Sequence, residues 1–192
     1  MMLLKPRFSK SDTVKLLLVS AFPVHFWAIL MVFKEADTWM TKRSIVYSLG
    51  ASGYVLGLAL LESLLLFGFI YLLSFLFPKN WSQKANLTVA AALALITAGW
   101  AIANQVYFFL GESPSHFYIW LHLWTNYRQT IAYLLFWLVM IASVAAPVLL
   151  LARSEKAQSA AQAVIEKVIL LAPLYLLFDL VGIVFTVIRN LT

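Results

Sequence analysis

The sequence predicts an all-α integral membrane protein: a bundle of five transmembrane helices, with one interfacial amphipathic helix between the third and fourth spans. Of its 192 residues, 63% are hydrophobic and only 11% are charged, whereas ordinary soluble proteins are roughly 45–50% apolar and about 25% charged. Several apolar runs reach about 20 residues, the length at which a helix crosses a bilayer. We therefore expect a single transmembrane domain, residues 1–192, with the lipid bilayer as its first partner.

Composition also excludes several classes of site. The chain has no cysteine, which removes disulfides, thiolate catalysis, iron–sulfur clusters and cysteine-based zinc sites. It contains no G-x-S-x-G, no H-E-x-x-H and no phosphate-binding glycine loop, so no catalytic signature is present and we expect no cofactor and no metal. The net charge of +6 is best explained by loop lysines and arginines facing anionic lipid, and not by a nucleic-acid partner.

The first predicted span covers about residues 14–33 and is followed by a short charged loop, residues 34–43. No small-x-small cleavage site follows the span, so we expect it to be retained and not removed as a signal peptide. His25 lies near its middle. The ordinary structural explanation for such a residue is a neutral imidazole that is hydrogen-bonded to a neighbouring helix.

The second predicted span, about residues 50–77, begins with glycines. Gly53 and Gly57 form a small-xxx-small pair, a pattern that lets another helix approach closely. A different face of the same helix carries Glu62, an acid at the depth of the membrane interior.

The third predicted span, about residues 88–110, has the clearest packing face. Small and polar side chains recur there at helical steps of three and four: Ala90, Ala94, Thr97, Ala101 and Asn104. This pattern predicts a central, tightly packed helix. Asn104 and Gln105 lie toward its end, where hydrogen bonds to neighbouring helices are their ordinary structural role.

The connection at residues 111–130 is the longest and the most aromatic. Ser113 and Pro114 are typical of the start of a helix, and apolar side chains then recur on one face. We therefore predict an amphipathic helix lying in the membrane interface. Its notable residues are His116, Trp120, His122, Trp124 and Arg128. The two histidines lie roughly 120° apart around a helix, so they do not form a paired metal site by themselves.

The fourth and fifth predicted spans cover about residues 131–152 and 168–189, and residues 153–167 have high helix propensity and connect them outside the bilayer. The fifth span carries Asp179 near its middle. Small and polar residues share a face with this acid: Ala172, Tyr175, Gly182, Thr186 and Asn190. A carboxylate at mid-bilayer costs on the order of 3 kcal/mol on insertion scales, so this face should meet protein or water.

Lysines and arginines predict the orientation of the bundle. The N-terminus and the second and fourth loops together hold nine of them, and the first and third loops and the C-terminus hold five. The positive-inside rule then gives a cytoplasmic N-terminus and an outside C-terminus in a plasma or inner membrane.

The residues that could carry chemistry form a predicted intramembrane polar cluster. Its members are His25, Glu62, Asn104, Gln105, Tyr175, Asp179 and Thr186. One hypothesis is that the cluster handles protons or small cations in a channel-like or transporter-like protein. The other is that it is a structural set of hydrogen bonds that locks the bundle.

Two further functions stay open. Short loops and small-residue faces also suit a non-catalytic subunit or scaffold that packs against copies of itself or against a partner membrane subunit. A lipid-processing enzyme is a third class, and its candidate residues would be Glu112, His116, His122 and Arg128, acting on a lipid head group.

Overall fold

The computed structural model describes residues 8–109 and 128–191, and every element in these ranges is helical. The elements are α1 (Lys10–Lys42), α2 (Ile45–Leu73), the short 3-10 helix η1 (Ser74–Leu76), α3 (Gln83–Phe109), α5 (Arg128–Arg153), α6 (Glu155–Ile169) and α7 (Ala172–Leu191). Five stretches are long and apolar enough to cross a membrane: Lys10–Thr41, Ile45–Leu76, Gln83–Val106, Leu134–Arg153 and Glu155–Ile188. The expected all-helical chain with five span-length helices is confirmed within these ranges.

One connection differs from its predicted form, and another agrees with it. The segment 34–43 was expected to be a loop, but α1 continues to Lys42 because no glycine or proline interrupts it. The break comes at Ser44, whose hydroxyl accepts a hydrogen bond from the backbone N–H of Tyr47 at 3.1 Å and so caps the start of α2. The segment 153–167, predicted to have high helix propensity, largely forms a helix of its own, α6.

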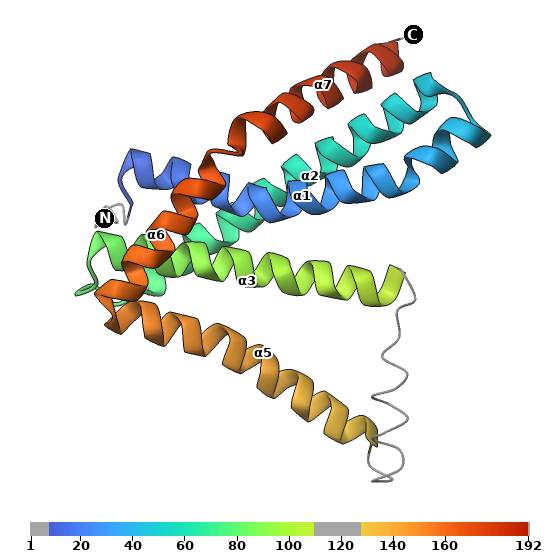
Figure 1. The fold of residues 1–192 in the computed structure, drawn as a ribbon. Helices are drawn as coiled ribbons and strands as arrows, with labels where there is room; N and C mark the ends of the chain where they lie inside the picture. Colours follow the sequence, from blue (N-terminus) through green and yellow to red (C-terminus); the bar gives the residue numbers. More distant parts are fainter. Residues whose placement is uncertain (1–7, 110–127, 192) are drawn as a thin grey trace, which may run out of the picture.

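The helices are arranged as a bundle that opens at one side (Figure 1). α2 packs against both α1 and α7, and α3 packs against α1, α2 and α5. α6 crosses one end of the bundle, where it contacts α1, α3 and α5 before the chain turns into α7. α5 lies close to α3 near α6 and diverges from it toward the other end (Figure 1).

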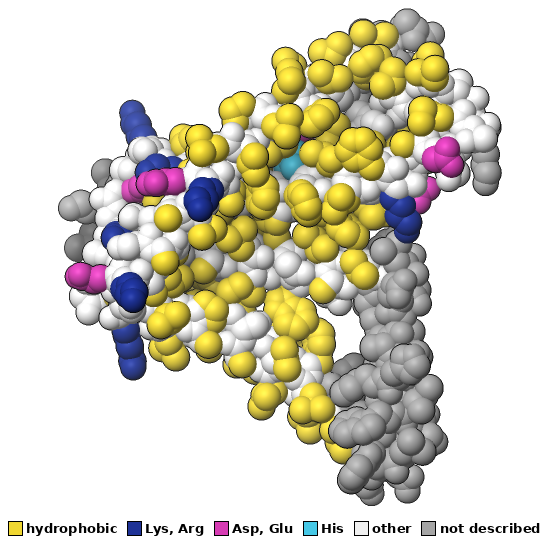
Figure 2. Space-filling model, in the orientation of Figure 1, with side chains coloured by type: hydrophobic (Ala, Val, Ile, Leu, Met, Phe, Trp, Pro, Cys, Tyr) yellow, Lys and Arg dark blue, Asp and Glu magenta, His cyan; other side chains and the backbone are white. Residues whose placement is uncertain are grey.

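The main hydrophobic core lies where the first halves of α1 and α3 meet the last part of α2. Leu16, Val19, Ile70, Ala90 and Ala94 are fully buried there. Outside the core, hydrophobic side chains cover most of the surface between the two ends of the bundle, and charged side chains gather at those ends (Figure 2). This distribution suits a bundle whose outer surface meets lipid.

The predicted packing face of α3 is only partly covered. Ala90 and Ala94 are buried, whereas Thr97, Ala101 and Asn104 are exposed. Small residues permit close packing only where a second helix is present. α5 diverges from α3 toward that end (Figure 1), and the later part of the predicted face remains exposed.

α2 and α7 approach each other closely at Gly53 and Gly182. A Cβ atom at position 53 would lie 2.6 Å from the carbonyl oxygen of Gly182 and 3.0 Å from Oγ1 of Thr186. Gly57 was expected to share this approach, but apart from its chain neighbours and the backbone of α2 itself, no heavy atom of the described residues lies within 4 Å of where its Cβ would be. The crossing therefore uses one glycine from each helix and not the glycine pair within α2.

This crossing predicts opposite effects for two similar substitutions. Gly53→Ala should destabilise the folded protein by roughly 1–3 kcal/mol, because the added methyl group would overlap the α7 backbone. Gly57→Ala is the matched control and should leave stability unchanged or raise it slightly, since alanine favours a helix over glycine. Thermal unfolding of both variants in one detergent measures the difference. Equal melting temperatures would show that the two helices do not meet at Gly53.

Candidate functional site: a buried histidine–aspartate pair

α1 and α7 bring His25 and Asp179 into direct contact inside the bundle. Nε2 of His25 lies 2.9 Å from Oδ1 of Asp179 and 3.0 Å from Oδ2. Their side chains are only 1% and 5% exposed. His25 also lies midway along the apolar stretch Lys10–Thr41. A buried titratable group is stable only when it has a partner, and here each residue is the partner of the other.

The second ring nitrogen of His25 is held by backbone and by α2. Nδ1 lies 2.8 Å from the carbonyl oxygen of Ala21, an atom that can only accept, so Nδ1 carries a proton. Oγ of Ser63 lies 3.3 Å from the same nitrogen and donates its own proton to the carbonyl oxygen of Ala59 at 2.6 Å. The Nδ1–H group therefore forms a bifurcated hydrogen bond to the Ala21 carbonyl oxygen and the Ser63 hydroxyl oxygen. In this way His25 connects α1, α2 and α7.

From these hydrogen-bond partners we infer the number of protons in the pair. With Nδ1 protonated, one more proton must lie between His25 and Asp179, since otherwise the Nε2 lone pair would face two carboxylate oxygens. On Nε2 that proton gives an imidazolium beside a carboxylate, and on Asp179 it gives a neutral imidazole beside a carboxylic acid. Both forms have zero net charge, which favours burial. The pair can thus move a proton between two atoms without changing its total charge.

Tyr175 of α7 fixes the plane of the imidazole. Its ring stacks on that of His25, with 5.0 Å between centroids and 29° between planes. Its hydroxyl donates to the carbonyl oxygen of Leu18 at 2.8 Å. Ala21 and Ala172 pack beside it. Because the tyrosine is held at both ends, the imidazole has little freedom to rotate away from Asp179.

The packing of α7 explains why Asp179 reaches His25. The predicted polar face is turned inward: Ala172, Tyr175, Asp179 and Gly182 are all buried. Their steps of three and four place them on one side of the helix. Because Gly182 lets α7 approach α2, the face that contains Asp179 lies against the rest of the bundle.

Glu62, the other acid of the predicted cluster, does not contact the pair. Its side chain is exposed on α2, whereas that of the next residue, Ser63, is fully buried against His25. Successive residues of a helix point about 100° apart. A rotation of α2 that brings Ser63 to the histidine therefore directs Glu62 toward the outside, and the expected single cluster is divided.

Three further members of the predicted cluster lie elsewhere. Gln105 of α3 accepts a hydrogen bond from the indole N–H of Trp27 on α1. Asn104 is exposed. Thr186 is half-buried beside Gly53 at the α2–α7 crossing. Of the predicted residues, the structure brings together His25, Tyr175 and Asp179.

The predicted interfacial helix falls outside the described residues. This applies to Glu112, His116, Trp120, His122 and Trp124, while Arg128 is the first residue of α5. Among the residues that the structure does describe, no three His, Asp or Glu side chains come together in a way that could hold a metal ion.

Sequence reasoning missed Ser63. The available signal was its spacing, because Gly53, Leu56, Ala59 and Ser63 recur at steps of three and four and all four are buried. Glu62 shares a neighbouring face, and its charge alone does not indicate which of the two faces turns inward.

Removal of either partner should be strongly destabilising. We expect His25→Leu and Asp179→Leu each to cost about 3–5 kcal/mol, because each leaves the other residue buried without a partner. The double variant should lose less than the sum of the two, since no unpaired group then remains. Unfolding of all four proteins in one detergent gives the coupling energy, and additive losses would mean that the two side chains do not interact.

Comparisons of the chain with protein-family models, with curated proteins and with solved structures find no significant match. Inferences about function therefore depend on the geometry of the site.

Proposed function

We propose that the protein is a channel-like or transporter-like membrane protein that handles protons or small cations at the His25–Asp179 pair. One observation supports this function above the others: two buried titratable side chains, His25 and Asp179, lie in hydrogen-bonding contact at the middle of a span-length helix. Titratable groups at this depth are expensive to bury and are typically part of ion or proton pathways. Histidine is also the side chain whose protonation changes most readily near neutral pH.

The proton balance of the pair suggests how it would act. Addition of one proton to the neutral pair gives an imidazolium beside a carboxylic acid, with a net charge of +1. Loss of one proton gives a neutral imidazole beside a carboxylate, with a net charge of −1. Both charged states are unfavourable inside the bundle. The pair would return to neutrality by releasing a proton, by taking one up, or by admitting a small cation beside the carboxylate.

The proposed orientation has the N-terminus in the cytoplasm and the C-terminus outside, in a plasma or inner membrane. The excess of lysine and arginine on the N-terminal side supports it, with nine against five.

Flux measurements separate a conducting pair from a structural one. Asp179→Asn should reduce proton or monovalent-cation flux into proteoliposomes by about tenfold or more, because an amide cannot take up and release the proton. Glu62→Gln is the matched control. It also replaces a carboxyl group by an amide, but at an exposed acid of α2, next in the sequence to the buried Ser63. This variant should retain flux.

Folding is checked in the same samples by thermal unfolding, and Asp179→Glu serves as a second variant that keeps the carboxyl group. Absence of flux from the unaltered protein would contradict the proposal. So would equal flux from the unaltered protein and a folded Asp179→Asn variant, since the pair would then only hold α1 against α7.

A second candidate function, a subunit or scaffold of a membrane complex, is favoured by Glu62. Its carboxyl group lies on the exposed surface of α2, near the exposed side chains of Leu58, Leu61 and Leu65. No hydrogen bond or ion pair joins it to another described residue. An acid at this depth rarely faces lipid alone, so a partner helix with a basic or hydrogen-bond-donating side chain would stabilise it.

Photo-crosslinking tests this surface. A photoreactive amino acid in place of Leu65, one turn from Glu62, should form a crosslink to a second polypeptide in membranes. Glu62→Leu should lower that yield severalfold, because the polar contact that positions the partner would be lost. The same photoreactive residue in place of Leu138, exposed on α5, is the control. Equal yields with and without Glu62 would argue against a partner at this surface.

A further inference from the structure

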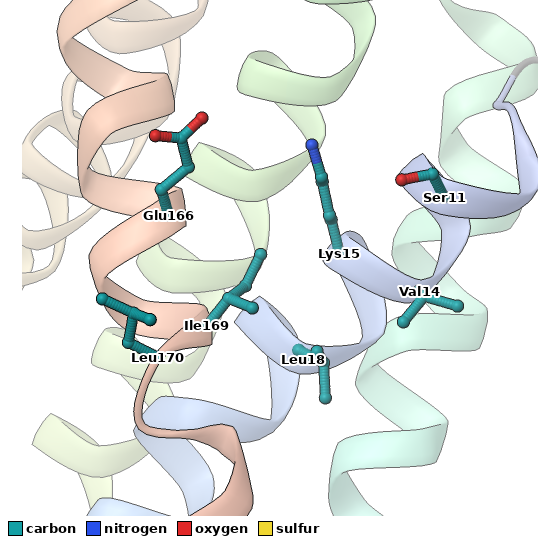
Figure 3. A pocket seen from close by; sticks show the side chains of 7 residues that line it. All are labelled: Ser11, Val14, Lys15, Leu18, Glu166, Ile169 and Leu170. Atoms are coloured by element: carbon teal, nitrogen blue, oxygen red, sulfur yellow. The ribbon is translucent and has the colours of Figure 1, made fainter.

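An open pocket of about 620 Å³ lies between α1 and α6, near the end of the bundle where α6 crosses α1. Its lining residues are Ser11, Val14, Lys15 and Leu18 of α1, Glu166 and Ile169 of α6, and Leu170. Figure 3 shows the Lys15 ammonium group and the Glu166 carboxylate on the same side of the pocket, with Leu18 and Leu170 on the other side. The pocket is therefore mostly apolar, with two charged groups of opposite sign at one side.

Along both helices, in the direction of the chain, the residues that line the pocket change from charged to apolar. On α1, Lys15 is followed one turn later by Leu18, and on α6, Glu166 is followed by Ile169 and Leu170. From this point α1 continues through a long apolar stretch, and α6 ends and leads into the apolar helix α7. The charged side of the pocket thus corresponds to the membrane surface, and the apolar side corresponds to the hydrocarbon layer.

The two charged groups are available to a ligand. In the part of the chain that the structure describes, neither Lys15 nor Glu166 forms an ion pair. Lys15 supplies an anion-binding group, with the hydroxyl of Ser11 on the same helix lining the same pocket. Glu166 of α6 supplies a cation-binding group on the same side of the pocket. An occupant that matches both must carry a negative and a positive charge, attached to an apolar chain.

We propose that this pocket binds a phospholipid whose head group holds a phosphate and a primary ammonium, as in phosphatidylethanolamine. The phosphate would bind Lys15 and Ser11, the ammonium would bind Glu166, and an acyl chain would lie along Leu18 and Leu170. A phosphate and a carboxylate both form strong charge-assisted hydrogen bonds with such partners. An anionic phosphatidylglycerol leaves Glu166 without a cation, and a choline head group has no N–H to donate to it.

The bound lipid would join the start of α1, the helix that carries His25, to α6, the helix that leads into α7. This inference does not rest on the proposed function, because lipid binding is measured without any flux.

Native mass spectrometry of the full chain in detergent tests the proposal. Phosphatidylethanolamine should bind tighter than phosphatidylcholine or phosphatidylglycerol by about fivefold or more, since only it matches both charged groups. Lys15→Ala should weaken binding of the ethanolamine and glycerol lipids alike, whereas Glu166→Gln should weaken only the ethanolamine lipid. Lys10→Ala and Glu155→Gln change charges on the same two helices outside the pocket, and both should leave the affinities unchanged.

Three results would overturn the assignment. Equal affinity for the three lipids would mean that the head group is not recognised. An equal loss of binding from Lys10→Ala would indicate general surface attraction. Strong competition by glycerophosphoethanolamine, which has no acyl chains, would identify a site for a free phosphate and amine and not for a lipid. Thermal unfolding of each variant shows that the protein is folded before its affinity is compared.

Discussion

The need to partner two titratable side chains inside an apolar bundle determines how three of the helices pack. Because His25 and Asp179 are each unstable without the other, α7 must turn its polar face toward α1. The carbonyl oxygen of Ala21 and the hydroxyl oxygen of Ser63 then lie within hydrogen-bonding distance of the second ring nitrogen, Nδ1. The close contact of Gly53 with Gly182 lets α7 approach near enough for this to happen. Backbone contact and polar contact therefore support the same arrangement.

Charged groups that the bundle leaves without an internal partner lie on its surface, and there they indicate what surrounds the protein. Glu62 is exposed in the middle of a span-length helix, and the proposed second polypeptide at that face rests on this position. Lys15 and Glu166 lie at one side of a mostly apolar pocket near one end of the bundle, where we propose that a lipid head group binds. The buried pair, by contrast, is satisfied within the chain, and the proton that we infer between its two side chains makes it a candidate for chemistry.

The helices and the inward face of α7 could be predicted from sequence because both are local properties. The length of an apolar run predicts a span, and the steps between Tyr175, Asp179 and Gly182 predict a shared face. The partner of that face could not be predicted in the same way, because it depends on the rotation of a distant helix. A rotation of α2 by one residue exchanges Ser63 for Glu62 at the histidine, and the sequence pattern permits both. The extension of α1 to Lys42 was missed since charge at a helix end resembles a loop.

The shared proton is tested most directly by ¹⁵N NMR of histidine-labelled protein in lipid bilayers. The chain has three histidines, so His116→Gln and His122→Gln leave His25 as the single labelled side chain. We predict a spectrum in which Nδ1 is protonated, because the Ala21 carbonyl can only accept, and in which the Nε2 signal shifts when Asp179 is replaced by Asn. A ring protonated only at Nε2, or an Nε2 signal that does not respond to Asp179→Asn, would contradict the shared-proton pair.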